Sequence, residues 1–360
     1  MTRYNPDNER LKRRYFEYLR EARRRNEASV DQAAAALARF EAFTGYKPFK
    51  AFHIEQAVAF KRHLAAQRSQ RSRGTLSKAT LHATLAALRA FFVWLAGQPG
   101  FRRRICYSDA DYFQLSERET RIARTRRERP APSLEQVLHV LNTLPAGTEI
   151  ERRDRAVIAF ALLTGARDGA LASLRLKHVD LAEGKVVQDG REVNTKFGKT
   201  IVTWFFPVGD PVRRIVEDWV TFLRDDRLSG PDDPLFPATK VVVGADGHFA
   251  AAGLDRRVWS TAAPIRRIFK QAFEQAGLPG FHPHSIRTTL TRLGEQRCRT
   301  PEQFKAWSQN LGHEKVMTTF TSYGSVPSHR QAAILHDLGQ PTDQDEETAR
   351  RVLAALRSAN

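Results

Sequence analysis

Residues 311–324 read Leu311-Gly312-His313-Glu-Lys-Val-Met-Thr-Thr-Phe-Thr-Ser-Tyr323-Gly324 and contain the single tyrosine of residues 131–360. The other six tyrosines of the chain lie before residue 113. In a chain with a net charge of +18, a lone phenol suggests a nucleophile aimed at a phosphate, because a deprotonated phenol can form a covalent intermediate. A tyrosine that packs in a core is the ordinary alternative. Phosphate-binding partners elsewhere in the sequence must decide between them.

Two arginines stand where they could bind such a phosphate. Arg167 ends the stretch Thr164-Gly165-Ala166-Arg167, directly after an apolar segment. Arg287 follows His284 by three residues, so both side chains would share one helix face. Arginine suits the task because its planar fork binds two oxygens and its charge does not titrate. Taken singly, each signal is weak, since an exposed arginine or a chance spacing explains it.

The positive charge is concentrated in the first third of the chain. Residues 1–130 hold 28 Lys and Arg against 13 Asp and Glu, whereas residues 131–360 hold 30 against 27. Residues 56–108 contain no acidic residue. This pattern predicts a polyanionic partner, and nucleic acid fits better than an anionic membrane because no exposed apolar face lies opposite the basic residues. The residues expected at a DNA interface are Arg62, Arg68, Arg71, Arg73, Lys78, His82 and Arg89.

Length and composition limit the class of protein. A chain of 360 residues, 41% of them hydrophobic, suits two domains of ordinary size. Cys106 and Cys298 have no ligand-like neighbours, so neither a disulfide nor a metal site is expected. The N-terminus has no apolar signal region, and no segment is expected to reach the apolar length of a membrane span. We therefore expect a cytosolic protein without a membrane partner.

The first domain is predicted to be a helical bundle over residues 1–115. Its clearest helix is Lys78–Ala96, which carries one apolar stripe, with Ser77 as the N-cap and Gly97 as the stop. Basic side chains lie on the opposite face of this helix. Further helices are expected at residues 10–25, 30–44 and 54–70.

A linker at residues 116–132, too charged to pack, is expected to lead into a second domain at 133–338 and a tail helix at 339–360. Ser133 and Gln136 predict a capping box, and an apolar helix is expected at 154–163. The fold class is therefore mainly α with a small antiparallel sheet. Strands are predicted at residues 185–188, 191–195 and 200–206, whereas residues 225–262 give no clear signal.

The order of these motifs is more specific than any one of them. Arg167, a lysine between the last two expected strands, the pair His284 and Arg287, then His313 and Tyr323 follow one another over about 160 residues. This order resembles that of the tyrosine recombinase, or phage integrase, family. Residues 16–43 and 77–97 look like the family's helical core-binding domain, so the resemblance covers nearly the whole chain. It implies a SAM-like bundle and a catalytic domain that clamp around DNA.

The resemblance also implies a role for each side chain. Tyr323 would attack the scissile DNA phosphate, forming a 3′-phosphotyrosyl link and a free 5′-hydroxyl. Arg167 and Arg287 would bind the non-bridging oxygens, and His313 would hydrogen-bond the same phosphate. His284 would accept the tyrosine proton. Because the covalent link keeps the energy of the phosphodiester, neither a metal nor ATP would be needed as a cofactor.

Two positions have alternatives. The proton donor to the departing 5′ oxygen would be Lys196 or Lys199, of which Lys196 matches the family's position better. His282 competes with His284, but only His284 has the three-residue spacing to Arg287. His282 would then have a capping or packing role.

The chain departs from the family pattern at three places. Ala170 stands where an acidic residue is usual, so the partner that orients Arg167 would come from elsewhere, and Asp168 is a candidate. Thr288 stands where histidine is common, and the tyrosine lies one residue further from the preceding histidine than is usual. No catalytic side chain is lost, so an active site-specific recombinase is expected. The alternatives are a catalytically altered DNA-binding protein of the same fold and a tyrosine-type topoisomerase.

Exchange of four strands requires four active sites, so the analogy implies a homotetramer on double-stranded DNA that carries a specific recombination site. Residues 346–357 are expected to form an amphipathic helix behind a hinge at Gly339. That helix could pass to a neighbouring subunit or fold back on its own domain. The expected setting is the cytoplasm and nucleoid of a bacterium, with a bacterial, phage or mobile-element gene. The target sequence, and the choice among integration, excision, resolution and transposition, stay open.

Overall fold

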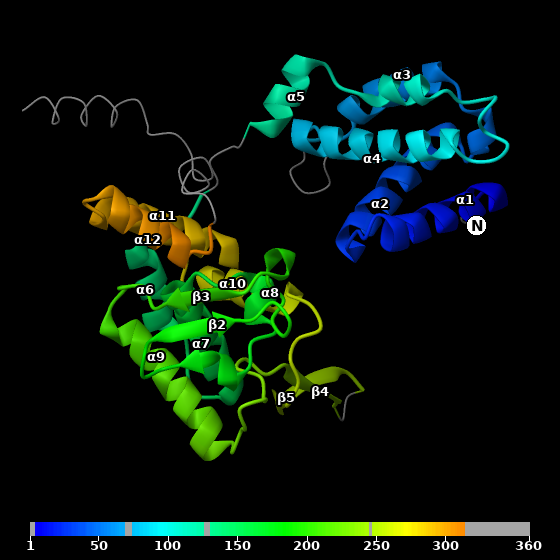
Figure 1. The fold of residues 1–360 in the computed structure, drawn as a ribbon. Coiled ribbons are helices and arrows are strands. Elements are labelled where there is room, and N and C mark those ends of the chain that lie inside the picture. Colours follow the sequence, from blue (N-terminus) through cyan, green and yellow to red (C-terminus); the bar gives the residue numbers. More distant parts are fainter. Residues whose placement is uncertain (1–3, 69–73, 126–129, 245–246, 314–360) are drawn as a thin grey trace, which may run out of the picture. The chain divides into compact units, whose positions relative to one another are not determined.

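The computed structural model describes residues 4–68, 74–125, 130–244 and 247–313 (Figure 1). The chain divides into two compact units, residues 1–126 and 127–360, called here the N-terminal unit and the C-terminal unit. Each unit has its own hydrophobic core. The predicted fold class, mainly α with a small antiparallel sheet, is confirmed.

The N-terminal unit is a bundle of helices around aromatic side chains. Phe40 packs edge-to-face on Phe60, Phe92 and Phe113, with ring centroids 5.2–5.6 Å apart. Such packing lets one ring bury several neighbours in a favourable geometry. The helices of this unit are α1 Pro6–Glu17, continued by the π-helical turn η1 Tyr18–Ala22, then α2 Glu27–Thr44, η2 Phe49–Ala51, α3 Ile54–Ala66, α4 Lys78–Ala96, η3 Tyr107–Phe113 and α5 Glu117–Arg124.

Helix α4 has the predicted bounds, with Ser77 accepting the N-cap hydrogen bond from Thr80 and Gly97 as the C-cap. Among the described residues it is also the one helix whose length and mean hydropathy, 1.4, would suit a membrane span, so the expectation that no segment reaches that length is wrong. Leu88, Phe92 and other α4 side chains fill the core of the unit. Its apolar character is therefore explained by core packing.

Three predicted bounds of the N-terminal unit differ from the structure. Asn5 caps α1, and Asn26 caps α2, so both helices begin earlier than the apolar periodicity indicates. Helix α3 ends at Ala66, four residues before the predicted end. The predicted unpacked linker contains α5, because Ser116 and Glu119 form a capping box and Lys78 pairs with Glu119 at 2.7 Å. Charge did not prevent this helix, since the capping box satisfies its first turn and Glu119 pairs with Lys78 of α4.

The C-terminal unit is built around α7 Glu149–Thr164, whose side chains from Ala156 to Thr164 are all buried. Thr148 and Glu151 form a capping box that starts α7 five residues before the predicted helix. The capping box predicted for Ser133 and Gln136 is confirmed. The other helices are α6 Leu134–Thr143, α8 Asp168–Leu171, η4 Leu176–His178, η5 Lys196–Gly198, α9 Asp210–Thr221, η6 Phe222–Asp226, α10 Ala263–Gln275, α11 Pro283–Arg297 and α12 Pro301–Asn310.

A three-stranded antiparallel sheet lies beside α7, in the order β1 Val179–Asp180, β2 Lys185–Gln188 and β3 Ile201–Trp204. The strand predicted at 191–195 is wrong. Asp189 is the cause, because its carboxylate accepts the Arg191 N–H and its carbonyl accepts the Glu192 and Val193 N–H groups, so these donors are used locally. Residues 225–262, for which no secondary structure was predicted, contain an antiparallel pair of strands, β4 Thr239–Val243 and β5 Phe249–Leu254.

Candidate active site

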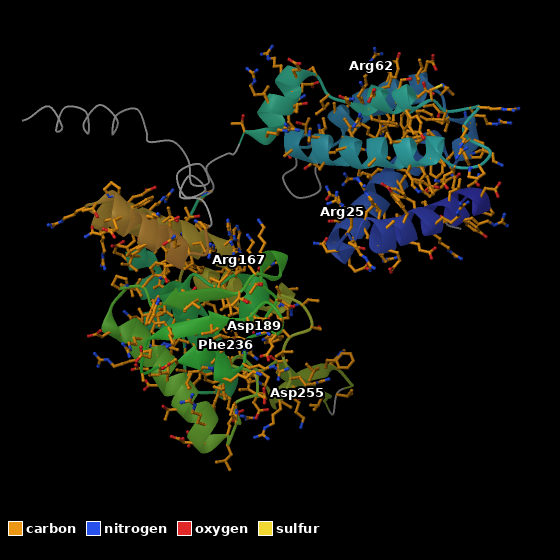
Figure 2. The ribbon with its side chains drawn as sticks, in the orientation of Figure 1. Arg25, Arg62, Arg167, Asp189, Phe236 and Asp255 are labelled. Atoms are coloured by element: carbon orange, nitrogen blue, oxygen red, sulfur yellow. The ribbon has the colours of Figure 1, made fainter. Side chains whose placement is uncertain are left out.

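Arg167 is placed by a tight turn at the end of α7. Gly165 caps that helix with a φ of +60°, a conformation that glycine adopts without strain. A Cβ at this position would lie 2.8 Å from Leu311 Cδ2 and 3.2 Å from Leu290 Cδ1. Arg167 then forms the N-cap position of α8, with its side chain half-buried (Figure 2). The turn that precedes Arg167 therefore packs against the middle of α11 and the C-terminal end of α12.

Replacing Gly165 by alanine is expected to destabilise the protein by about 2–4 kcal/mol, because the left-handed strain adds to the overlap with Leu311. Gly277→Ala is the matched control, since Gly277 has a φ of +73° and open space around its Cα hydrogens. That variant should cost only the strain, about 1 kcal/mol. Chemical denaturation measures the free energy of unfolding of both variants. An equal decrease in the two would show that the close approach of Gly165 to Leu311 does not contribute to stability.

Arg287 is buried in α11, with 3% of its surface exposed, while His284 lies exposed in the first turn of that helix. The Arg287 guanidinium donates to the carbonyl oxygens of Gly165 and Leu311. It also lies 3.1 Å from His313 Nε2. Because arginine can only donate, His313 Nε2 accepts this hydrogen bond and the imidazole is neutral, with its proton on Nδ1.

The segment that holds His313 is fixed by Asn310, the last residue of α12. Its Oδ1 accepts from the Trp204 N–H at 2.7 Å, and its Nδ2 donates to the Trp204 carbonyl at 2.8 Å. The side-chain amide thus pairs with β3 as a neighbouring strand would. The role of Asn310 was not predicted, since a single asparagine before Leu-Gly gives no signal of a partner more than a hundred residues away.

The pKa of His313 is sensitive to four of the other predicted catalytic residues. Burial first, and then the charges of four side chains, lower the pKa of His313 to about 4. These side chains are Arg287, Arg167, His284 and Lys196. Such interactions weaken with distance, so these charges lie within electrostatic range of His313. Arg287 contacts the histidine directly, at 3.1 Å.

The pKa of His313 predicts a specific loss of stability in acid. The unfolded histidine binds its proton near pH 6.5, whereas the folded one binds it only near pH 4. This stabilising contribution is therefore complete above pH 6.5 and is lost as the pH falls from 6.5 to 4, by at most about 3 kcal/mol. Denaturation curves across that range should show a smaller loss for His313→Gln than for the wild type. Equal losses would contradict the depressed pKa.

Lys196 lies on the long connection between β2 and β3, in the single turn η5, and is exposed. The two ends of this connection touch through backbone, since a Cβ at Gly190 would lie 2.0 Å from the Gly198 carbonyl oxygen. Lys199 is half-buried next to β3. The charge of Lys196 contributes to the low pKa of His313.

Arg167 and Arg287 line a common hollow. Gln188 of β2 and Thr203 of β3 line it as well. Its volume, about 10 Å³, holds no more than one water molecule, so a DNA phosphate would have to bind at its rim. The hollow thus marks where the two guanidinium groups converge.

The structure also places His282, the alternative to His284, and Asp168, the candidate partner of Arg167. His282 is the N-cap residue of α11, and its carbonyl, not its imidazole, accepts the capping bonds from Ser285. The Asp168 carboxylate, considered as a partner for Arg167, binds Arg266 of α10. Ala170 is buried in the core, where an acidic side chain would need a partner.

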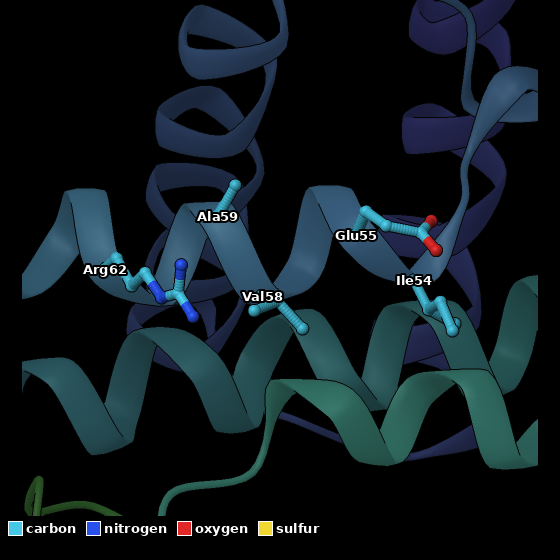
Figure 3. Close-up of a pocket in the computed structure, with 5 residues that line it drawn as sticks. All are labelled: Ile54, Glu55, Val58, Ala59 and Arg62. Carbon is cyan, nitrogen blue, oxygen red and sulfur yellow. The ribbon is translucent and has the colours of Figure 1, made fainter.

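The predicted DNA-binding residues of the N-terminal unit are differently placed. Arg62 is exposed beside a shallow groove along α3 that Ile54 and Val58 line (Figure 3). Lys78 and Arg89 are bound to the carboxylates of Glu119 and Asp111, at 2.7 and 2.8 Å. Contact with DNA would compete with these ion pairs. Arg68 is exposed and His82 half-buried, whereas Arg71 and Arg73 lie outside the described residues.

Tyr323, Glu346 to Arg357 and the rest of the predicted tail also lie outside the described residues, so their roles stay predictions. Thr288 is half-buried on α11. Within the described ranges, no group of three His, Cys, Asp or Glu side chains is placed to hold a metal ion.

Comparison with known proteins agrees with the geometry of the C-terminal unit. The model of the phage integrase family matches residues 131–329. Tyrosine recombinase XerC of Stutzerimonas stutzeri is 26% identical over 316 residues, which cover 85% of this chain and 88% of that protein. A lambda integrase (75–356) dimer bound to a COC′ core site aligns with a TM-score of 0.60 at 14% identity, over 88% of this chain and 95% of that one. XerH bound to a difH substrate aligns with a TM-score of 0.57 at 16% identity, over 90% and 83%.

Proposed function

Because this chain belongs to the phage integrase family and is a tyrosine site-specific recombinase, we propose that it cuts and rejoins DNA through a covalent link to Tyr323. The observation that carries this proposal is that Arg167 and Arg287 line one hollow, where Arg287 also contacts His313 at 3.1 Å. The charges of Lys196 and His284 act on the same histidine. A buried arginine and several further cations around one point are what a phosphoryl group requires. Tyr323 follows ten residues after His313 in the sequence, within reach of that point.

In the proposed cleavage step, the Tyr323 oxygen forms a bond to the scissile phosphorus and its proton passes to His284. The bond between phosphorus and the 5′ oxygen breaks, and Lys196 gives a proton to that oxygen. The products are a 3′-phosphotyrosyl link and a 5′-hydroxyl. Rejoining is the reverse reaction, with a 5′-hydroxyl of the partner strand as the attacking group. Atoms and charges balance without ATP or a metal.

Arg287 is already held in place for this chemistry. Its hydrogen bonds to the Gly165 and Leu311 carbonyls fix the guanidinium before DNA arrives, so little reorganisation is needed when charge builds up on the phosphate. Neutral His313 beside it can donate one hydrogen bond to the same phosphate without adding a second buried charge. Arg167, less buried, would bind the other non-bridging oxygen.

The proposed partner is double-stranded DNA with a specific recombination site. Residues 1–130 carry an excess of 15 positive charges, 28 minus 13, which suits the phosphate backbone. Four copies would assemble on two duplexes, since each strand needs one tyrosine. The proposed setting is the cytoplasm of a bacterium, where the gene belongs to the chromosome, a phage or another mobile element.

A nicked duplex tests the proposal. DNA fragments that the protein selects from the sequence around its own gene are rebuilt with a nick just beyond the scissile phosphate, so that the cleaved end diffuses away. The expected result is a covalent complex that resists denaturant and releases a DNA-linked peptide containing Tyr323. Absence of covalent complex on every selected site would exclude the enzymatic function. Relaxation of supercoiled plasmids without any selected site would instead identify a topoisomerase.

A further inference from the structure

Three neighbouring residues anchor the connection that carries Lys196. The Glu192 carboxylate binds side chains of η4. Val193 is 2% exposed and belongs to the core of the C-terminal unit. The Asn194 N–H donates to Ser173 Oγ at 2.8 Å. All three anchors lie within four residues of Lys196, so its backbone starts from a fixed point.

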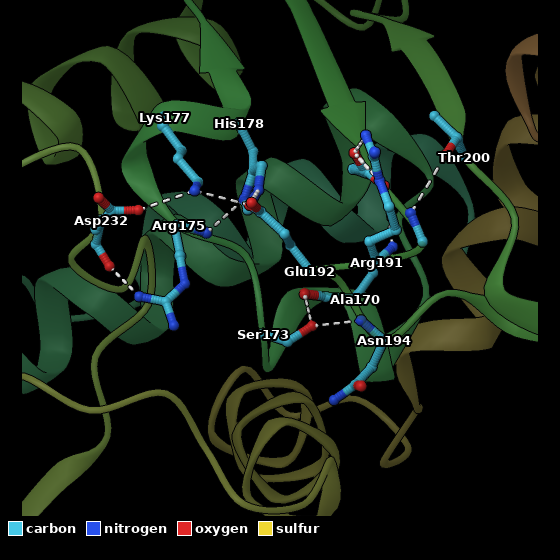
Figure 4. Close-up of polar contacts among 12 residues, drawn as sticks. Ala170, Ser173, Arg175, Lys177, His178, Arg191, Glu192, Asn194, Thr200 and Asp232 are labelled. Carbon is cyan, nitrogen blue, oxygen red and sulfur yellow. Dashed lines mark hydrogen bonds and ion pairs between the residues drawn. The ribbon is translucent and has the colours of Figure 1, made fainter.

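Glu192 has a well-defined orientation because its carboxylate binds the buried imidazole of His178 (Figure 4). His178 is 6% exposed, and its Nδ1 accepts the Arg175 N–H at 2.9 Å. The ring proton is therefore on Nε2, which donates to Glu192 Oε2 at 2.9 Å. Lys177 Nζ lies 2.8 Å from the same oxygen. Lys177 first, and His178 with it, hold the pKa of the Glu192 carboxyl below its usual range, so it is ionised at neutral pH.

These contacts join two segments that each carry a candidate catalytic residue. Residues 167–178 begin at Arg167 and end at the histidine that Glu192 binds. We propose that Glu192 is a positioning residue that holds Lys196 in register with Arg167, an inference that rests on the proposed role of Lys196 as the proton donor. Asp232 provides a natural comparison, because it also binds Lys177, at 2.9 Å, but belongs to a different loop.

The cleavage chemistry separates this role from a general effect on folding. As the bond between phosphorus and the 5′ oxygen breaks, a misplaced ammonium group cannot deliver the proton that the oxygen needs. A sulfur atom at the same bridging position leaves as a thiolate, since thiols have a pKa near 8.5 while alcohols are far weaker acids, and it needs no proton donor. A defect that acts only through Lys196 should therefore disappear on a sulfur-bridged substrate.

The experiment compares Glu192→Gln, Asp232→Asn and Lys196→Ala in the full-length protein, on nicked duplexes with oxygen or sulfur at the bridging position. For Glu192→Gln we expect single-turnover cleavage of the oxygen substrate to fall about tenfold to a hundredfold, with unchanged DNA affinity. The sulfur substrate should restore the wild-type rate, which also shows that the variant is folded. Asp232→Asn should cleave both substrates as the wild type does.

Normal cleavage of the oxygen substrate by Glu192→Gln overturns the inference, as does a defect that sulfur does not repair, or an equal defect in Asp232→Asn. If sulfur rescues Lys196→Ala but not Glu192→Gln, only the role of Glu192 fails. If sulfur does not rescue Lys196→Ala, the proposed proton donor is wrong, and the inference falls with it.

Discussion

A Tyr323→Phe variant is expected to bind its recombination site with wild-type affinity and to form no covalent complex. The change removes one oxygen atom, the one that would bond to phosphorus, and leaves the cations around His313 in place. No other tyrosine lies in residues 131–360 to replace it. Because the nucleophile is lost, the rate of covalent attachment should fall by at least about 10⁴-fold, whatever the pH. The measurement is covalent trapping on the nicked duplex, beside a binding titration.

Tyr112→Phe is the matched control for this variant. Tyr112 is an exposed tyrosine of the N-terminal unit, so its loss should leave trapping unchanged. Mass spectrometry of the trapped peptide identifies the attached residue in the wild type. A Tyr323→Phe protein that still forms covalent complex would assign the nucleophile to another side chain.

Arg287→Lys is expected to have the second largest effect, lowering cleavage by about 10²–10³-fold. Lysine keeps the positive charge but has a single nitrogen, so it cannot hold a phosphate oxygen in the fixed plane that the anchored guanidinium offers. Its one nitrogen would replace the two that donate separately to the Gly165 and Leu311 carbonyls, so we expect one of these buried acceptors to lose its donor, at a cost of about 1–3 kcal/mol of folding stability. Single-turnover cleavage and denaturation of the same preparation measure the two losses.

Arg297→Lys controls for the change of residue type on the same helix. Arg297 is exposed in the last turn of α11, where it donates to the Pro207 carbonyl. Its replacement should change cleavage by less than about twofold, since surface substitutions alter stability by about 0.5 kcal/mol or less. If Arg287→Lys cleaved DNA as fast as Arg297→Lys, the buried guanidinium would have no part in catalysis.

Local patterns predicted much of the secondary structure. The apolar stripe of α4, with Ser77 and Gly97 at its ends, is confirmed to the residue because period and caps are properties of adjacent positions. The strand predicted at 191–195 failed for an equally local reason. Asp189-Gly190 is a turn sequence, and the Asp189 side chain and carbonyl take the backbone donors that a strand would need. That signal was in the sequence and outweighs the apolar alternation that follows it.

By itself, the sequence determined the identity and order of the candidate catalytic residues, the helical N-terminal bundle and the nucleophile proposed at Tyr323. Only the tertiary structure decided that Arg167 and Arg287 line one hollow and that Arg287 contacts the buried His313. The bond from Arg287 to the Gly165 carbonyl spans 122 residues. Such contacts depend on how α7, α11 and α12 pack, which periodicity does not encode. The depressed pKa of His313 and the anchoring of Lys196 through Glu192 follow from that packing, because burial and charge act through space and not along the chain.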